Sequence, residues 1–278
     1  MGTHRRSTTQ SGVVGSRVRH VFALVLALCL ATAQPIAHAD YVVPANASTS
    51  LNGGSISLAC TDLIVGGSFS LGSGSVTGVR NVIIQSGGNL NGGSGALSLA
   101  GNFANSGNFS AGTGSVNFVD MSGCTTTGVG TVSGNNSFYD LSFVTTSATG
   151  KTYAFAAGST QLINHLFTVR GTAAGPLQLT SSVAGQPAFI NLPITGAQSM
   201  ANLGAVDLVA IGVWLAPNLV NLAPSNGASA IGWFGVPQTL IVPTLSSTAV
   251  IALTLLLSLI AYRAARRRPA TTARHLRP

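Results

Sequence analysis

The 278-residue sequence contains no glutamate, and only 6% of its residues carry a charged side chain. Glutamate, lysine and arginine are residues that helices commonly place on their solvent-exposed faces, so their scarcity argues against a helical domain. Glycine, serine, threonine, asparagine and alanine dominate residues 40–241, yet valine, leucine, isoleucine and phenylalanine are too frequent there for a disordered linker. The composition therefore predicts an all-β protein whose wet surface is carried by serine, threonine and asparagine.

The formal net charge of +8 belongs to the two ends of the chain. The terminal bases are Arg5, Arg6, Arg17, Arg19, Arg263, Arg266, Arg267, Arg268, Arg274 and Arg277. Between Asp40 and Val242 there are five acids and three bases, which leaves this part near −2. Nucleic-acid binding needs a basic face on the folded part of a protein, so no nucleic-acid partner is expected.

Residues 1–39 predict a signal peptide. An arginine-bearing start is followed by the 13-residue apolar run Val21–Ala33, and Ala37 and Ala39 supply small residues at the cleavage positions. The apolar residues that a twin-arginine signal places after its pair are missing after Arg6. We therefore expect the general secretory translocase and signal peptidase as partners, and a mature chain that begins at Asp40.

A repeat of about 20 residues follows. Residues 66–79 (GGSFSLGSGSVTGV) and 106–119 (SGNFSAGTGSVNFV) share eight of fourteen positions. The anchoring apolar positions of the repeat are Leu51, Phe69, Leu90 and Phe109. Short alternating strands of this period, broken by glycine and asparagine, are typical of the coils of a β-solenoid, which bury a shared apolar column by stacking about 4.8 Å apart. We expect the four anchors to line one interior column.

Residues 101–143 support this fold by resemblance. The segments GNFANSGNF (101–109), GSVNF (114–118) and FYDLSF (138–143) resemble repeats of bacterial surface solenoids. Those are the right-handed parallel β-helix passengers of adhesin-like and haemagglutinin-like proteins, so the resemblance implies a fold and a location at the cell surface. Alternation continues more loosely to about residue 205. Residues 206–234 contain Trp214 and Trp233 and predict a C-terminal β cap, since open solenoid ends need one. Residues 235–240 would form a linker.

Cys60 and Cys124 remain after removal of the signal. Two cysteines in an exported chain suggest one disulfide. The predicted coils nevertheless separate them by three rungs, roughly 14 Å, whereas a disulfide needs Cα atoms within about 7 Å. Three alternatives stay open: the coils are irregular there, the cysteines are buried and free, or the fold is a sandwich.

The sequence offers few candidates for catalysis. Residues 40–241 contain one histidine, His165, which alternation places on a strand. The acids are far apart, and no nucleophile motif or Cys/His set with metal-ligand spacing occurs. The acids in question are Asp62, Asp120, Asp140 and Asp207. We expect no catalytic residues, no metal and no cofactor.

Residues 241–269 predict a membrane-spanning sorting signal. Ile241 to Tyr262 covers 22 residues, about 33 Å as a helix, which is enough to cross a bilayer. An arginine cluster follows, as a stop-transfer segment requires; it consists of Arg263, Arg266, Arg267 and Arg268. Residues 270–278 would form a cytoplasmic tail.

The start of this segment also resembles a sorting motif. The motif residues are Val242, Pro243, Thr244, Leu245 and Ser246. Together with the apolar span and the arginines they resemble the IPTL-CTERM sorting signal of Gram-negative bacteria, with valine where isoleucine is usual. This signal is related in layout to the PEP-CTERM signals handled by exosortases. The resemblance implies an exosortase-like processing enzyme as a partner; the alternative is a plain anchor that is never processed.

These features predict an exported protein of the bacterial cell envelope, anchored in the inner membrane by its C-terminal helix or processed to the cell surface. Its expected role is structural or adhesive, toward polysaccharide or matrix. The alternative is a polysaccharide-active β-helix enzyme, which would bring at least two of the four acids together with Lys151 or Arg170 in one groove. A eukaryotic GPI-anchored protein should end in apolar residues, and Arg266–Arg268 argue against that.

Overall fold

In the computed structural model the described residues are 2, 39–121, 123–124, 128–224, 229–235, 254, 256–258 and 262–263. The chain divides into two units, Met1–Phe234 and Gly235–Pro278. Most of the predicted signal peptide (residues 1 and 3–38), sorting motif residues 242–246 and arginines 266–268 lie outside the described residues. In the second unit, residues 254, 256–258 and 262–263 are helical, and no helix within the described part of the chain has the length and apolarity of a membrane span.

The described residues of the first unit form strands whose pairings with one another are all parallel. In chain order the strands are β1 (Tyr41–Val43), β2 (Ser48–Ser50), β3 (Ser55–Val65), β4 (Ser68–Ser70), β5 (Ser75–Ile84), β6 (Asn89–Asn91), β7 (Ala96–Leu99), β8 (Phe103–Asn105), β9 (Asn108–Ser110), β10 (Ser115–Val119), β11 (Gly130–Ser133), β12 (Asn136–Val144), β13 (Lys151–Phe155), β14 (Thr160–Arg170), β15 (Leu177–Ser181), β16 (Ala188–Leu192), β17 (Ala197–Ala201), β18 (Leu203–Val206) and β19 (Leu208–Gly212).

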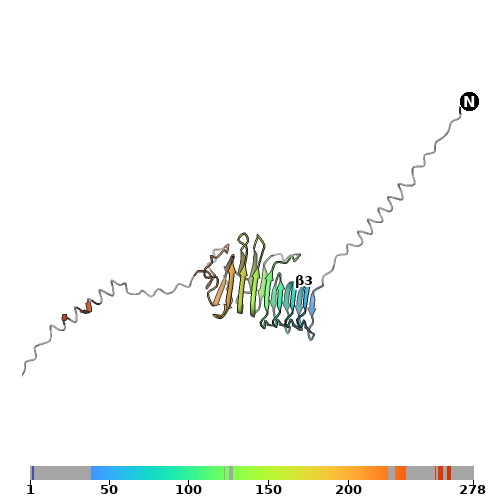
Figure 1. The fold of residues 1–278 in the computed structure, drawn as a ribbon, viewed down its shortest axis with the longest axis horizontal. Helices are drawn as coiled ribbons and strands as arrows, with labels where there is room; N and C mark the ends of the chain where they lie inside the picture. The colour runs from blue at the N-terminus through green and yellow to red at the C-terminus, as the bar shows by residue number, and fades with distance from the viewer. Residues whose placement is uncertain are drawn as a thin grey trace, which may run out of the picture. The chain divides into compact units, whose positions relative to one another are not determined.

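The chain winds as a parallel β-solenoid of about seven turns, with successive coils side by side (Figure 1). Its strands form three ladders, and a further run of pairs joins the first halves of β12 and β14 to β16 and then β19. Ladder 1 consists of β2, β4, β6 and β9. Ladder 2 pairs the first halves of β3 and β5 with β7, β10, the second halves of β12 and β14, and β17. Ladder 3 pairs β1 with the second halves of β3 and β5, then β8, β11, β13, β15 and β18. The all-β solenoid predicted from the sequence is confirmed.

Inward side chains of the three ladders meet in one apolar core. Its largest fully buried side chains are Phe69, Phe103, Phe118, Phe138, Phe143, Tyr153, Phe155 and Phe167. Phe118 and Phe143 stack in successive rungs with ring centroids 4.4 Å apart, and Tyr153 lies edge-on to Phe118 at 5.1 Å. A parallel solenoid forms here because each rung alone exposes its apolar face, and only a neighbouring rung covers that face while completing the backbone hydrogen bonds.

The predicted anchor column is correct for three of its four members. Phe69 pairs with Leu90, and Leu90 pairs with Phe109. The placement of Leu51 is wrong: Thr49 pairs with Phe69, and the Leu51 amide bonds to the Ser70 carbonyl at 2.9 Å. The cause is that a slip of two residues keeps every side chain on the same face, so alternation cannot distinguish the two registers.

The parallel ladder extends beyond the boundary expected at residue 205. β19 pairs residue by residue with β16, from Leu208 to Gly212. After it, isolated bridges join Val209 to Ile231 and Leu215 to Trp233. The Trp233 side chain is buried with its ring edge-on to Phe167. The end of the predicted cap therefore supplies apolar cover for the last rungs.

Candidate functional site

Ladder 1 carries a regular polar array on its outer side. Its four strands have the sequences STS, SFS, NLN and NFS, in which only the middle residue points inward. The outer residues stack in register from rung to rung. One column is Ser48, Ser68, Asn89 and Asn108, and the other is Ser50, Ser70, Asn91 and Ser110. With rungs about 4.8 Å apart, this face is a flat, uncharged lattice of hydroxyl and amide groups.

Ladder 2 repeats the pattern. Its first four rungs contain SIS (55–57), SVT (75–77), ALS (96–98) and SVN (115–117). Ser57 pairs with Thr77. From Ser98 onward each residue pairs with the next along the column Ser98, Asn117, Ser142, Thr168 and Ser199. The structure thus provides hydroxyl and amide columns on two sides of the solenoid.

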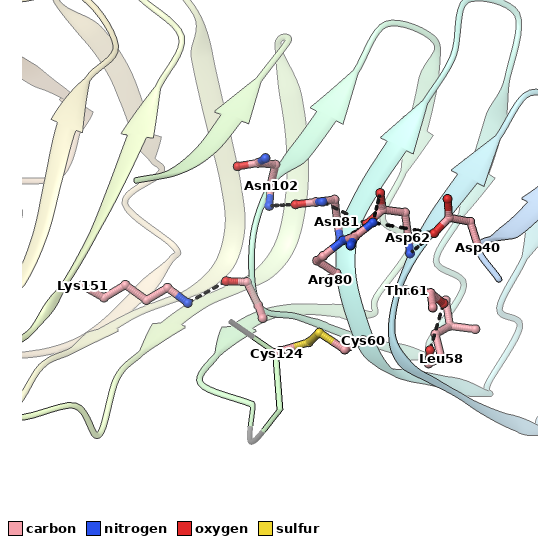
Figure 2. The surroundings of a disulfide bond; sticks show 11 residues. Asp40, Leu58, Cys60, Thr61, Asp62, Arg80, Asn81, Asn102, Cys124 and Lys151 are labelled. Carbon is pink, nitrogen blue, oxygen red and sulfur yellow. Dashed lines mark hydrogen bonds and ion pairs between the residues drawn. A yellow bond between two sulfur atoms is a disulfide. The ribbon is translucent and has the colours of Figure 1, made fainter. Parts of the chain in front are cut away.

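A second kind of column stands at the corner before ladder 3. In this column each side-chain oxygen accepts from the backbone amide of a residue in the next rung. The Asp40 carboxylate accepts from the Asp62 amide at 3.0 Å, and the Asp62 carboxylate accepts from the Asn81 amide. The Asn81 side-chain oxygen accepts from the Asn102 amide, and that of Asn102 accepts from the Thr131 amide. Figure 2 shows this column from Asp40 to Asn102, in which the side-chain oxygens of Asp40, Asp62 and Asn81 each accept from the backbone amide of the next rung. Sequence reasoning missed it. The signal is an aspartate or asparagine directly before each ladder 3 strand, at 40, 62, 81 and 102.

Asp62 is the buried member of this column of aspartate and asparagine side chains. Its side chain accepts two hydrogen bonds from Arg80, and the Asn81 side-chain amide donates a further bond of 2.9 Å. The Arg80 hydrogen bond is the main cause that lowers the pKa of Asp62, against burial, which alone would raise it. Asp40 lies 3.8 Å from the same guanidinium. This network therefore joins three successive rungs, and its charges are satisfied within the protein.

Cys60 and Cys124 form a disulfide with Cα atoms 5.3 Å apart (Figure 2). Of the three alternatives, irregular coils apply. Ala59 and Cys60 have positive φ, and the pairing of β3 with β5 is interrupted between Ser57 and Thr61. Cys124 lies after β10 rather than on a rung, so rung spacing does not limit its distance from Cys60.

The disulfide borders a groove of about 870 Å³. Ser57, Thr77 and Ser98 line it from ladder 2, and Arg80 lines it from the corner. Met121, Gly123 and Cys124 line it from the segment after β10. None of the four acids considered as catalytic candidates lines this groove.

A second groove, of about 650 Å³, contains Asp120 and Lys151. Lys151 Nζ donates to the Ala100 carbonyl at 2.6 Å and lies 3.8 Å from Asp120 Oδ1. Burial lowers the pKa of Lys151, and the charge of Asp120 opposes that effect. Burial alone would raise the pKa of Asp120, but hydrogen bonds from Thr145 and Thr146 and the charge of Lys151 lower it. The sequence separates this pair by 31 positions, and no local pattern pointed to it.

The remaining acids lie elsewhere. Asp140 Oδ1 is 2.7 Å from His165 Nδ1, on the exposed side of β12 and β14, where the His165 ring stacks on Tyr139. Asp207 accepts from the Gly185 amide. The clustering expected of a polysaccharide-active enzyme, two acids with Lys151 or Arg170 in one groove, is not found among the described residues lining the two grooves. His, Cys and Asp side chains there form no metal-binding group of three.

The family model described as the IPTL-CTERM motif matches residues 242–268. No curated protein and no solved structure matches the chain. The predicted sorting signal is thereby confirmed, and it indicates a protein exported and sorted to the cell envelope or surface.

Proposed function

From an IPTL-CTERM sorting signal joined to a β-solenoid, we propose an exported surface protein with a structural or adhesive role. Residues 1–39 direct the chain to the secretory translocase, and cleavage after Ala39 leaves Asp40 as the first residue. The helix from Ile241 to Tyr262 then holds the protein in the inner membrane of a Gram-negative cell until an exosortase-like enzyme processes it. The solenoid winds right-handed, as parallel β crossovers generally do, and its polar faces meet polysaccharide or matrix.

The observation that carries the role is the in-register array of ladder 1. An uncharged lattice of hydroxyl and amide groups forms many weak hydrogen bonds to a hydrated polymer at once. A rigid surface adds such bonds with little loss of conformational freedom, because the side chains are short and the backbone is held by its ladders. An adhesive protein needs this kind of repeated contact, whereas an enzyme needs a few convergent groups.

Export and sorting are tested by fractionating cells that express the full chain and mapping its termini by mass spectrometry. We expect a mature N-terminus at Asp40 and recovery in the envelope or at the surface. Pro243→Ala and Thr244→Ala in the sorting motif should leave N-terminal cleavage unchanged and retain the protein in the inner membrane. A soluble cytosolic product with residues 1–39 intact would contradict the proposal.

The adhesive role is tested separately by comparing attachment of these cells to a polysaccharide matrix. Replacing Ser68, Asn89 and Asn91 together by aspartate should reduce attachment at equal surface amounts, because charge disrupts the neutral lattice. Unchanged attachment would contradict a role for ladder 1.

A further inference from the structure

The groove that contains Asp120 and Lys151 is distinct from the polar faces of ladders 1 and 2. It is formed by segments far apart in the sequence, and its walls include Ser147, Thr149 and Pro176. The Lys151 side chain is only 12% exposed, while that of Asp120 is 32% exposed. The groove therefore places a partly buried charged pair beside hydroxyl groups and a proline ring.

The geometry of the pair leaves room for a third group. Lys151 Nζ and Asp120 Oδ1 are 3.8 Å apart, which is longer than a direct hydrogen bond of about 2.7–3.2 Å. One oxygen atom can lie within hydrogen-bond distance of both, since polar contacts beyond 3.5 Å are commonly bridged. The bridging atom must accept from the ammonium and donate to the carboxylate. A hydroxyl group or a water molecule does both, whereas an ionised carboxylate or a phosphodiester cannot donate and an ammonium cannot accept.

We propose that this groove binds a neutral saccharide residue, with one of its hydroxyl groups seated between Lys151 Nζ and Asp120 Oδ1. The opposite charges of the pair cancel, which disfavours strongly charged ligands, and Pro176 supplies an apolar surface for the C–H face of a sugar ring. The low exposure of Lys151 strengthens the hydrogen bonds that it makes. This inference rests on the proposed function, because it assigns the polysaccharide contact to a particular groove.

Binding is measured by isothermal titration calorimetry on the protein purified from the envelope, with cellohexaose, laminarihexaose and xylohexaose as neutral probes and hexagalacturonate as an anionic probe. We expect saturable binding of at least one neutral probe at millimolar concentration and weaker binding of hexagalacturonate. Asp120→Asn and Lys151→Met should each weaken it about tenfold, the loss expected for one charge-assisted hydrogen bond.

Two further variants distinguish a loss of binding at the groove from a loss of folded protein. Thr149→Trp changes an exposed residue of the groove and should block binding by filling the space, with circular dichroism unchanged. Asp140→Asn is the matched control, because the Asp140 side chain is 30% exposed and pairs with His165 outside the groove. This variant should bind as the unmodified protein does.

The outcomes separate this site from the proposed function. A protein delivered to the envelope whose folded form binds none of the neutral probes would overturn the site and leave export standing. Binding that Asp120→Asn, Lys151→Met and Thr149→Trp leave unchanged would overturn it too, and would place the contact on ladder 1 or 2. Tighter binding of hexagalacturonate than of the neutral probes would overturn the proposal that the ligand is a neutral saccharide.

Discussion

The carboxylate of Asp62 and the guanidinium of Arg80 lie in neighbouring rungs and share two hydrogen bonds, of 2.8 and 2.9 Å. Asp62 is 8% exposed, and its backbone amide is itself bonded to Asp40. This ion pair and the hydrogen bond to Asp40 together connect three coils near the N-terminal end of the solenoid.

Asp62→Asn should reduce the amount of stability that the protein loses as the pH is lowered into the acid range. The pKa of Asp62 in the folded protein is lowered. The ionised side chain therefore adds to the free energy of unfolding above the unfolded-state pKa of about 3.9. That stabilisation is lost as the pH falls through the lower pKa of the folded state. The variant should be less stable at pH 7 by about 1–2 kcal/mol, since Arg80 is partly exposed to solvent. Urea unfolding at pH 7 and below pH 3 measures both effects, and an equal acid dependence in the two proteins would contradict the ion pair.

Removal of the disulfide should destabilise the protein by roughly 2–4 kcal/mol, because the bond closes a long loop of the unfolded chain. The two cysteines are 64 positions apart. We expect Cys60→Ser with Cys124→Ser to have the urea midpoint of the reduced protein. Alkylation of both thiols without prior reduction would show that the bond is absent from the mature protein.

Asn136→Ala should break a buried chain of side-chain amides. Asn136 accepts from Asn105 and donates to Gln161, both at 2.8 Å. The variant leaves the buried Gln161 oxygen without this donor, which costs about 1–3 kcal/mol. Asn164→Ala, at an exposed amide bonded to Ser137, is the control and should cost about 0.5 kcal/mol. Thermal unfolding of both variants tests this, and equal losses would contradict the argument from burial.

Gly93→Ala should be far more damaging than Gly87→Ala. Both glycines have positive φ, +59° and +81° respectively. A Cβ at Gly87 would meet no atom within 4 Å, so only backbone strain of about 1–2 kcal/mol is expected. A Cβ at Gly93 would collide with the Gly72 carbonyl of the neighbouring rung. We expect Gly93→Ala to give little folded protein by circular dichroism, and comparable melting temperatures for the two variants would refute close stacking at this corner.

The repeat between Phe69 and Phe109 was readable in the sequence because an inward residue recurs every rung and its neighbours stay polar. The register at Leu51 could not be read from the sequence, because a slip of two residues leaves every side chain on the same face of the strand. The column Asp40, Asp62, Asn81 and Asn102 has a signal in the sequence. That signal can be recognised only when the start of each ladder 3 strand is known.

By itself the sequence determined the all-β composition, the coil period and the sorting signal, since each is written in local residue types or in spacings along the chain. Only the tertiary structure decided that Cys124 returns to Cys60 and that Lys151 meets Asp120. Those distances depend on how loops leave the rungs and on which coils lie side by side, and these follow from the packing of the whole stack.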